Sequence, residues 1–317
     1  MRLAVLTGPE TFEVQDVPAP VPERGEVLLD VAVCGVCASE LDAWTGSVET
    51  AYPRFLGHEV SGTVAALGEG VAGVAVGDRV GVWVTSHGFA EQVAVPAAHC
   101  FQVGDVPLDT ALAEPLACAV NAVELADVRL GDDVVIIGAG YMGLLVQQLV
   151  SMRGPRQVVV ADTRPDALER ARASGATRTV LVGEESPADA VAAATGGGAA
   201  DVCFECTGTQ AALRTVGEVT RMSGKVVLVG YHQGPDRAIP LGAWNWMAYD
   251  LRNGHFRDVP VILRGMAVGA RLTGAGVFDQ SPLITHRFGL DDIGLAFATA
   301  VAKPPGFVKA TVVMGSS

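Results

Sequence analysis

The sequence is poor in positive charge. Its 317 residues include 22 lysines and arginines against 35 aspartates and glutamates, which gives a formal net charge of −13 and an isoelectric point near 4.8. Nucleic acids and anionic membrane surfaces attract proteins through counter-charge, and no basic stretch offsets this balance. We therefore expect neither nucleic acid nor a membrane as a partner.

Cysteine is also scarce. Six cysteines in a chain of this length do not form a disulfide framework, and the pairs Cys34-x-x-Cys37 and Cys203-x-x-Cys206 are better interpreted as thiols or ligands in a reducing compartment. The opening residues, MRLAVLTGPETFEVQDV, contain one basic residue and break early at Gly8, so they do not resemble a signal peptide. We expect a cytoplasmic protein.

What the chain does have is a glycine-rich turn between two short apolar runs. Such a run, turn and helix, followed by a second run that ends in an acid, is typical of a dinucleotide-binding βαβ unit. The parts are, in order, the run 134–137, Gly138, Gly140, Gly143, the run 158–161 and Asp162.

Each part of this pattern has a physical role. Gly138 permits the tight turn, Gly140 lets the backbone approach a pyrophosphate, and Gly143 lets the helix pack close to the strand. Asp162 can accept hydrogen bonds from the adenosine ribose, and its charge opposes a 2′-phosphate, which favours NAD over NADP. Arg164 lies close enough to soften that preference. The expected cofactor-binding residues are Gly138, Gly140, Tyr141, Met142, Gly143, Asp162 and Arg164.

Two other interpretations of this stretch are possible from its composition. A glycine fingerprint alone is weak evidence, because glycine-rich turns also occur without a nucleotide. The uncharged stretch from Val134 to Met152 also has the length of a membrane span. Its three glycines, Gln147, Gln148 and a strand-like start argue against that interpretation.

The rest of the chain divides into a β-rich part and an alternating α/β part. Up to about residue 95 short strands alternate with glycine and proline turns, which is typical of a β-barrel-like domain. A helix around residues 114–126 then leads to the fingerprint, and strands and helices alternate up to about residue 229, which predicts a doubly wound parallel sheet. We expect an α/β protein with a catalytic domain of residues 1–120 and 280–317 and a dinucleotide-binding domain of residues 121–279.

Cys37, His58 and Glu59 are the metal candidates of the first half. Thiolate, imidazole and carboxylate together suit zinc, and a catalytic zinc keeps one position open for water or substrate. The spacing alone leaves two alternatives open. The histidine could be structural, and Cys34 and Cys37 could be buried thiols.

Four segments, taken together, resemble the zinc-containing medium-chain dehydrogenase/reductase superfamily, and most closely its polyol (sorbitol) and threonine dehydrogenase branch. They occur in the order of that family and span most of the chain: CGVCASELDAWTG (34–46), GHEVSGTVAALGEGVAGVAVGDRV (57–80), EPLACAVNAVE (114–124) and VVIIGAGYMGLLVQQL (134–149). The resemblance implies a GroES-like catalytic domain and a Rossmann NAD-binding domain. It also implies one catalytic zinc and pairing into a homodimer or homotetramer.

The resemblance also implies roles for individual residues. Cys37, His58 and Glu59 match the family's cysteine ligand, histidine ligand and adjacent acid, and Ser39 matches the hydroxyl that relays the alcohol proton. The remaining ligand is open, because Glu114 matches the acid of the polyol branch and Cys118 falls where simple alcohol dehydrogenases have a cysteine.

The sequence departs from the family in two places. No cysteine lies between Asp78 and Val95, where relatives commonly carry a four-cysteine lobe, so we expect no structural zinc. Asp42 stands where many relatives have the histidine that ends the proton relay, and a carboxylate there accepts a proton with a different pKa.

The expected activity is hydride transfer between NAD and a secondary alcohol or the matching ketone, the alcohol being a polyol, a sugar derivative or an amino alcohol. Ser39, Asp42 and Glu114 are the expected catalytic residues. The rival hypotheses are a zinc-free enzyme that resembles quinone reductases and an NAD-binding protein without catalysis.

Overall fold

A computed structural model describes residues 1–314 and divides them into two compact units. Residues 1–117 and 260–314 form unit 1, and residues 118–259 form unit 2. The chain thus returns to unit 1 earlier than the expected residue 280. The reason is α8 (Val259–Gly274), which buries Met266 beside Ala113 and Ala117 of the helix α2 (Ala113–Ala126).

Unit 1 is built on a seven-stranded sheet with the strand order β14-β15-β3-β4-β5-β7 and with β6 paired to β3. Alternating burial along β3 explains this sheet, since its apolar side chains point into a core that also holds Trp44, Phe89 and Phe297. The strands are β3 (Glu26–Gly35), β4 (Glu59–Leu67), β5 (Arg79–Trp83), β6 (Gln92–Pro96), β7 (Cys100–Gln102), β14 (Ile284–Gly289) and β15 (Lys309–Val313).

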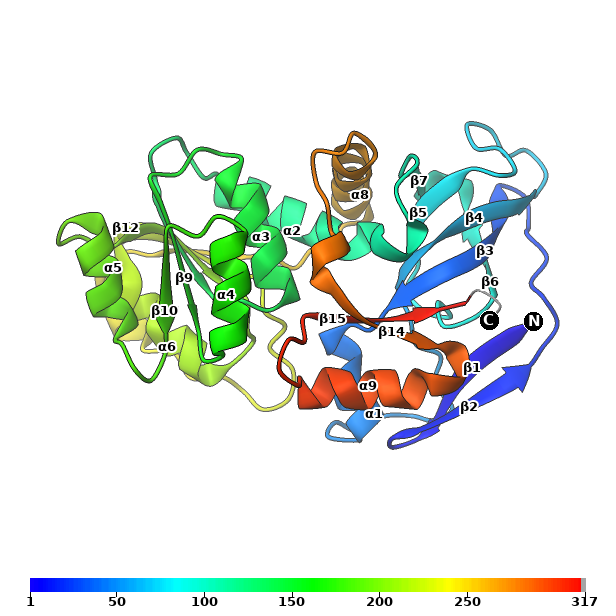
Figure 1. Cartoon of the computed structure of the whole chain (residues 1–317), viewed down its shortest axis with the longest axis horizontal. Coiled ribbons are helices and arrows are strands. Elements are labelled where there is room, and N and C mark those ends of the chain that lie inside the picture. Colours follow the sequence, from blue (N-terminus) through cyan, green and yellow to red (C-terminus); the bar gives the residue numbers. More distant parts are fainter. Residues whose placement is uncertain (315–317) are drawn as a thin grey trace. The chain divides into compact units, whose positions relative to one another are not determined.

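Smaller elements complete unit 1. The hairpin of β1 (Arg2–Gly8) and β2 (Thr11–Asp16) forms a separate sheet, and a 3-10 helix η1 (Ala38–Glu40) leads into α1 (Leu41–Thr45). The helix α9 (Ile293–Ala302) packs against β14 and β15 (Figure 1). The sequence gives little sign of α9, because its residues are apolar on nearly every side and show no helical period.

Unit 2 is a six-stranded parallel sheet with the order β10-β9-β8-β11-β12-β13. Helices α3 and α4 pack together on one face, and α5 and α6 pack together on the other (Figure 1). The expected α/β class with a doubly wound parallel sheet is confirmed. The elements are β8 (Asp133–Ile137), α3 (Tyr141–Ser151), β9 (Gln157–Asp162), α4 (Pro165–Ala173), β10 (Arg178–Leu181), α5 (Pro187–Thr195), β11 (Ala200–Glu205), α6 (Gln210–Val219), β12 (Thr220–Leu228), α7 (Leu241–Trp246) and β13 (Asp250–Asn253).

The order of the strands reverses next to β8. The chain moves outward from β8 through β9 to β10 and then crosses to β11 on the other side of β8. Ligands of doubly wound sheets bind at the carboxyl ends of the strands at such a switch point. No helix within residues 1–314 is both long and apolar enough to cross a membrane, and the uncharged stretch considered above forms β8 and α3.

Candidate active site

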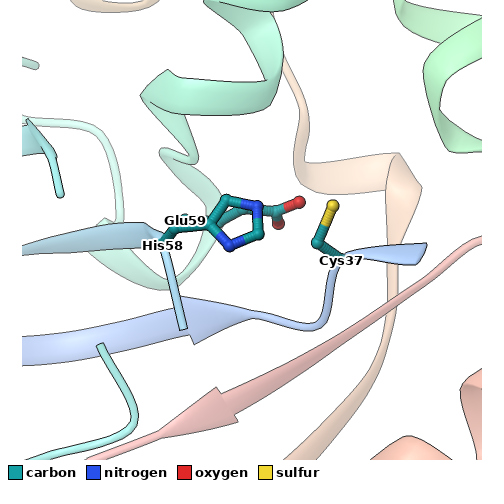
Figure 2. A group of neighbouring side chains, drawn as sticks. All are labelled: Cys37, His58 and Glu59. Atoms are coloured by element: carbon teal, nitrogen blue, oxygen red, sulfur yellow. The ribbon is translucent and has the colours of Figure 1, made fainter. Parts of the chain in front are cut away.

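Three possible metal ligands meet where β3 and β4 adjoin. Gly35 at the end of β3 is paired with Glu59 at the start of β4. Cys37 follows Gly35 by two residues, and His58 directly precedes Glu59. One ligand atom from each of Cys37, His58 and Glu59 lies within 4.8 Å of the others (Figure 2). Within residues 1–314 this is the one group of three or more histidine, cysteine or acidic side chains that is arranged to hold a metal.

Glu40, a residue that the sequence analysis missed, orients His58. Its side chain is largely buried, and its Oε1 accepts a hydrogen bond from the backbone N–H of Gly57 at 2.7 Å and lies 3.1 Å from Nδ1 of His58. A carboxylate on one ring nitrogen is the usual support of a metal-binding histidine, so Nε2 is the nitrogen left for a metal. The feature of the sequence that could have indicated Glu40 is the presence of an acidic residue three positions after Cys37.

The donor set fits zinc. Burial opposes protonation of His58, but the neighbouring Cys37 and Glu40 outweigh it and raise the pKa of the imidazole well above its ordinary value. These surroundings therefore favour a positive charge at this place. Thiolate, imidazole and carboxylate are the ligands that zinc prefers, and a metal ion supplies such a charge.

Glu59 forms a buried ion pair with Lys309 of β15, the second residue that the sequence analysis missed. The Lys309 Nζ lies 2.7 Å from Oε1 and 2.6 Å from Oε2 of Glu59, and it donates a hydrogen bond to the Val36 carbonyl at 2.9 Å. Burial works against the charged lysine, but Glu59 and then Cys37 raise its pKa above the ordinary value. Gly35 is required here, because a Cβ at that position would lie 2.0 Å from Oε2 of Glu59.

The two expected relay residues lie on the short helices that follow Cys37. The Ser39 hydroxyl donates a hydrogen bond to the Cys37 sulfur at 3.2 Å. Asp42 is half-buried in the first turn of α1. Ser39 belongs to η1 and Asp42 to α1, so the part of these two residues in a proton relay stays a prediction.

The two candidates for the remaining ligand lie one turn apart on α2. Glu114 is in the first turn of this helix, and its charge is among those that raise the pKa of Lys309. Cys118 is half-buried. Neither belongs to the three-residue group, so the choice between them stays a prediction.

The glycine turn in unit 2 has the geometry that the sequence predicts. Gly138 has a φ of +101°, and a Cβ there would lie 2.6 Å from Cγ2 of Thr207. A Cβ at Gly143 would lie 1.8 Å from the Gly138 carbonyl oxygen, so the helix packs directly on the turn. Gly140 precedes α3 and faces open space. The start of α3 is thus open to an anion such as a pyrophosphate.

Asp162, at the end of β9, organises the same turn. Its Oδ2 accepts a hydrogen bond from the Ala139 N–H at 2.6 Å, and its Oδ1 accepts one from the Arg164 N–H at 2.8 Å. The guanidinium of Arg164 is paired with Asp166. The carboxylate of Asp162 therefore joins the glycine turn to the residues that follow β9.

Comparison with known proteins identifies the family. Residues 23–105 match the model of the alcohol dehydrogenase GroES-like domain, and residues 142–253 match that of the zinc-binding dehydrogenases. The chain is 31% identical to sorbitol dehydrogenase of Gallus gallus over 91% of its own length and 90% of that protein. The chain belongs to the zinc-containing medium-chain dehydrogenase/reductase superfamily.

Further relatives lie in the same branch of this superfamily. L-threonine 3-dehydrogenase of Photorhabdus laumondii is 29% identical, with 93% of this chain and 94% of that protein covered. The crystal structure of 2R,3R-butanediol dehydrogenase from Bacillus subtilis is 26% identical and superposes with a TM-score of 0.84 over 99% of both chains. The expected superfamily, its polyol branch and the enzyme class are confirmed. The chain is an oxidoreductase of the zinc-dependent alcohol dehydrogenase type, and a nicotinamide cofactor and a catalytic zinc belong to that type.

Proposed function

We propose that this protein transfers hydride between NAD and a secondary alcohol, a polyol, sugar-derived or amino alcohol, or reduces the matching ketone, at one zinc held by Cys37, His58 and a nearby acid. The observation that carries the proposal is the meeting of Cys37, His58 and Glu59 within 4.8 Å in a chain that also has the dinucleotide turn. A screen of secondary alcohols and ketones with zinc-loaded protein, read by NADH absorbance, tests it.

The residues of the chain supply binding and proton transfer. When bound, zinc would polarise the substrate oxygen and nicotinamide would accept or return the hydride. The Ser39 hydroxyl takes up the alcohol proton, and Asp42, three residues further on, is its expected acceptor. Glu40 holds the His58 ring, while Glu59 is neutralised by Lys309 and remains available as a reserve ligand.

Glu114 is the proposed further acid at the metal, with Cys118 as the alternative. We expect Glu114→Ala to lower zinc affinity by roughly 10- to 100-fold and to lower turnover, because Glu114 contributes its charge beside the Glu59–Lys309 pair. Cys118→Ser is expected to affect packing only. Metal content after gel filtration should be near one zinc per chain for the unmodified protein and for Cys118→Ser. Loss of zinc from Cys118→Ser, with metal and activity intact in Glu114→Ala, would reverse the assignment.

Asp162 is expected to set the choice of cofactor. Asp162→Ser removes the charge that opposes a 2′-phosphate and should improve the kcat/KM ratio of NADP to NAD by at least about tenfold. The exposed Asp189 of α5 offers a matched control, since Asp189→Ser removes the same charge away from the turn. Equal use of both cofactors by the unmodified protein would contradict this prediction.

A second copy of the chain is the proposed partner, through the edge of the unit 2 sheet. β13 ends the strand order with Leu251 exposed, and Trp246, the last residue of the preceding helix α7, is 79% exposed. An unpaired edge with apolar side chains favours pairing with another strand, so we expect a homodimer or a homotetramer built from such pairs.

Leu251→Asp should split that assembly, because two carboxylates would then approach each other across the symmetric interface. Leu295→Asp, at an exposed leucine of α9 in unit 1, is the matched control and should leave the mass unchanged. Light scattering at micromolar concentration measures both. A monomeric mass for the unmodified protein would refute the pairing.

A further inference from the structure

A fully buried carboxylate stands at the carboxyl end of β11. Glu205 is the last residue of that strand, and none of its side chain is exposed. Its Oε1 accepts hydrogen bonds from the N–H and hydroxyl of Thr207 at 2.7 and 2.5 Å and from the Gly208 N–H at 3.0 Å. Nε2 of His232 lies 3.0 Å from Oε2. Backbone N–H groups can only donate, so the carboxylate of Glu205 serves as their acceptor.

No lysine or arginine among residues 1–314 forms a direct ion pair with Glu205, and the nearby Arg237 donates a hydrogen bond to the Gly208 carbonyl. Within this part of the chain the one ion-pair partner of Glu205 is His232, which is charged only when protonated. Gly230, at the exit of β12, is required beside the carboxylate, since a Cβ there would lie 2.5 Å from Oε2. The carboxylate is therefore built into the sheet edge, and the expected relay and metal site, which lie in unit 1, do not use it.

The position of Glu205 in the sheet determines which part of a dinucleotide it faces. The strand order reverses between β8 and β11, and a dinucleotide lies across the carboxyl ends of the strands at such a point. The half with β9 and Asp162 serves the adenosine ribose, which leaves the half that begins with β11 for the nicotinamide. Thr207, which donates hydrogen bonds to Glu205, also lies against the glycine turn at Gly138. The half of the sheet that begins with β11 therefore adjoins the turn that would hold the pyrophosphate.

Charge distinguishes the two forms of the cofactor in this half. The oxidised nicotinamide ring carries a positive charge and the reduced ring carries none, whereas the ribose, phosphate and adenine parts are the same in both forms. A fixed negative charge in a poorly solvated place acts on this difference. The effect of this charge on binding is separable from any structural role, because a loss of structure would weaken the binding of both cofactor forms alike.

We infer that Glu205 is a specificity-determining residue for the redox state of the cofactor, and that its buried negative charge strengthens binding of the oxidised dinucleotide relative to the reduced one. The inference rests on the nicotinamide binding that belongs to the proposed function. It gives the buried carboxylate a part in the reaction, since weaker relative binding of NADH favours its release after alcohol oxidation.

Dissociation constants of NAD and NADH for the full chain and for Glu205→Gln test this inference. Glutamine fills the same space and keeps an acceptor for Thr207 and Gly208. We expect the ratio Kd(NAD)/Kd(NADH), measured by calorimetry and by NADH fluorescence at about pH 8, to rise roughly three- to tenfold. Glu218→Gln is the matched control. Glu218 is exposed near the end of α6. This helix runs away from the carboxyl ends of the strands, so the ratio Kd(NAD)/Kd(NADH) should not change in this variant.

A second variant keeps the test decisive if Glu205→Gln does not fold. His232→Lys leaves the carboxylate in place and adds a permanent cation beside it, so the ratio should move in the same direction. Equally weakened binding of NAD and NADH by the folded Glu205→Gln protein would overturn the inference. An unchanged ratio Kd(NAD)/Kd(NADH) in His232→Lys would overturn it as well. If the unmodified protein binds neither dinucleotide, the proposed function itself fails and the inference with it.

Discussion

Cys37→Ser is expected to remove the bound zinc and to lower turnover by roughly 10³-fold or more, which corresponds to several kcal/mol of lost transition-state stabilisation. Cys37 supplies the one sulfur of the three-ligand group. A serine hydroxyl in its place is a far weaker ligand for zinc than a thiolate. Metal content and initial rate should therefore fall together in this variant.

Cys100→Ser is the control for this prediction. Cys100 lies on β7 in the same unit but outside the group, and burial raises its pKa to about 12, so it stays a neutral thiol. The substitution should leave metal content and rate nearly unchanged. Full activity and one zinc per chain in Cys37→Ser would show that the metal is held elsewhere.

Lys309→Met is expected to lower the free energy of unfolding of the metal-free protein by roughly 3–5 kcal/mol, because it leaves the buried carboxylate of Glu59 without its cation. Both side chains are almost fully buried, so water cannot replace the ammonium group. The loss should be smaller in the zinc-loaded protein, where the metal provides positive charge beside the same acid. Urea denaturation of both forms measures the two values.

A double-mutant cycle separates the ion pair from general packing. Glu59→Gln combined with Lys309→Met should recover part of the stability lost in Lys309→Met alone, since no unpaired charge remains. The exposed Lys303 offers a control, and Lys303→Met should change stability by less than about 0.5 kcal/mol. If the double variant is less stable than Lys309→Met, the pair is not what stabilises this end of the sheet.

The dinucleotide unit was predictable from the sequence because its evidence is local. The turn at Gly138, the helix after it and Asp162 lie within one continuous stretch, and each residue type there follows from the backbone geometry that it must adopt. Cys37 and the neighbours His58 and Glu59 were candidates because of their residue types, and the register of β3 and β4 brings them together. A local pattern therefore predicted the dinucleotide turn, whereas the three possible metal ligands meet through the pairing of two strands.

What the sequence did not reveal depends on contacts between distant segments. Lys309 pairs with Glu59, 250 positions away, and only a lone charge in the apolar run of β15 hinted at it. Glu40 contacts His58, which lies 18 positions further along the chain. From the sequence alone, an acid at this position is interpreted as an ordinary turn residue. The return of the chain to unit 1 through α8 depends on packing against α2, which no single stretch of sequence encodes.

The most direct test of a zinc-dependent dehydrogenase is to remove the metal and return it. NADH formation from secondary alcohols is measured with protein as purified, after chelation and gel filtration, and after addition of one equivalent of zinc. The proposal predicts turnover in the first sample, its loss in the second together with the zinc, and its recovery in the third. Undiminished turnover of the metal-free protein would contradict the account and would favour the zinc-free type of enzyme.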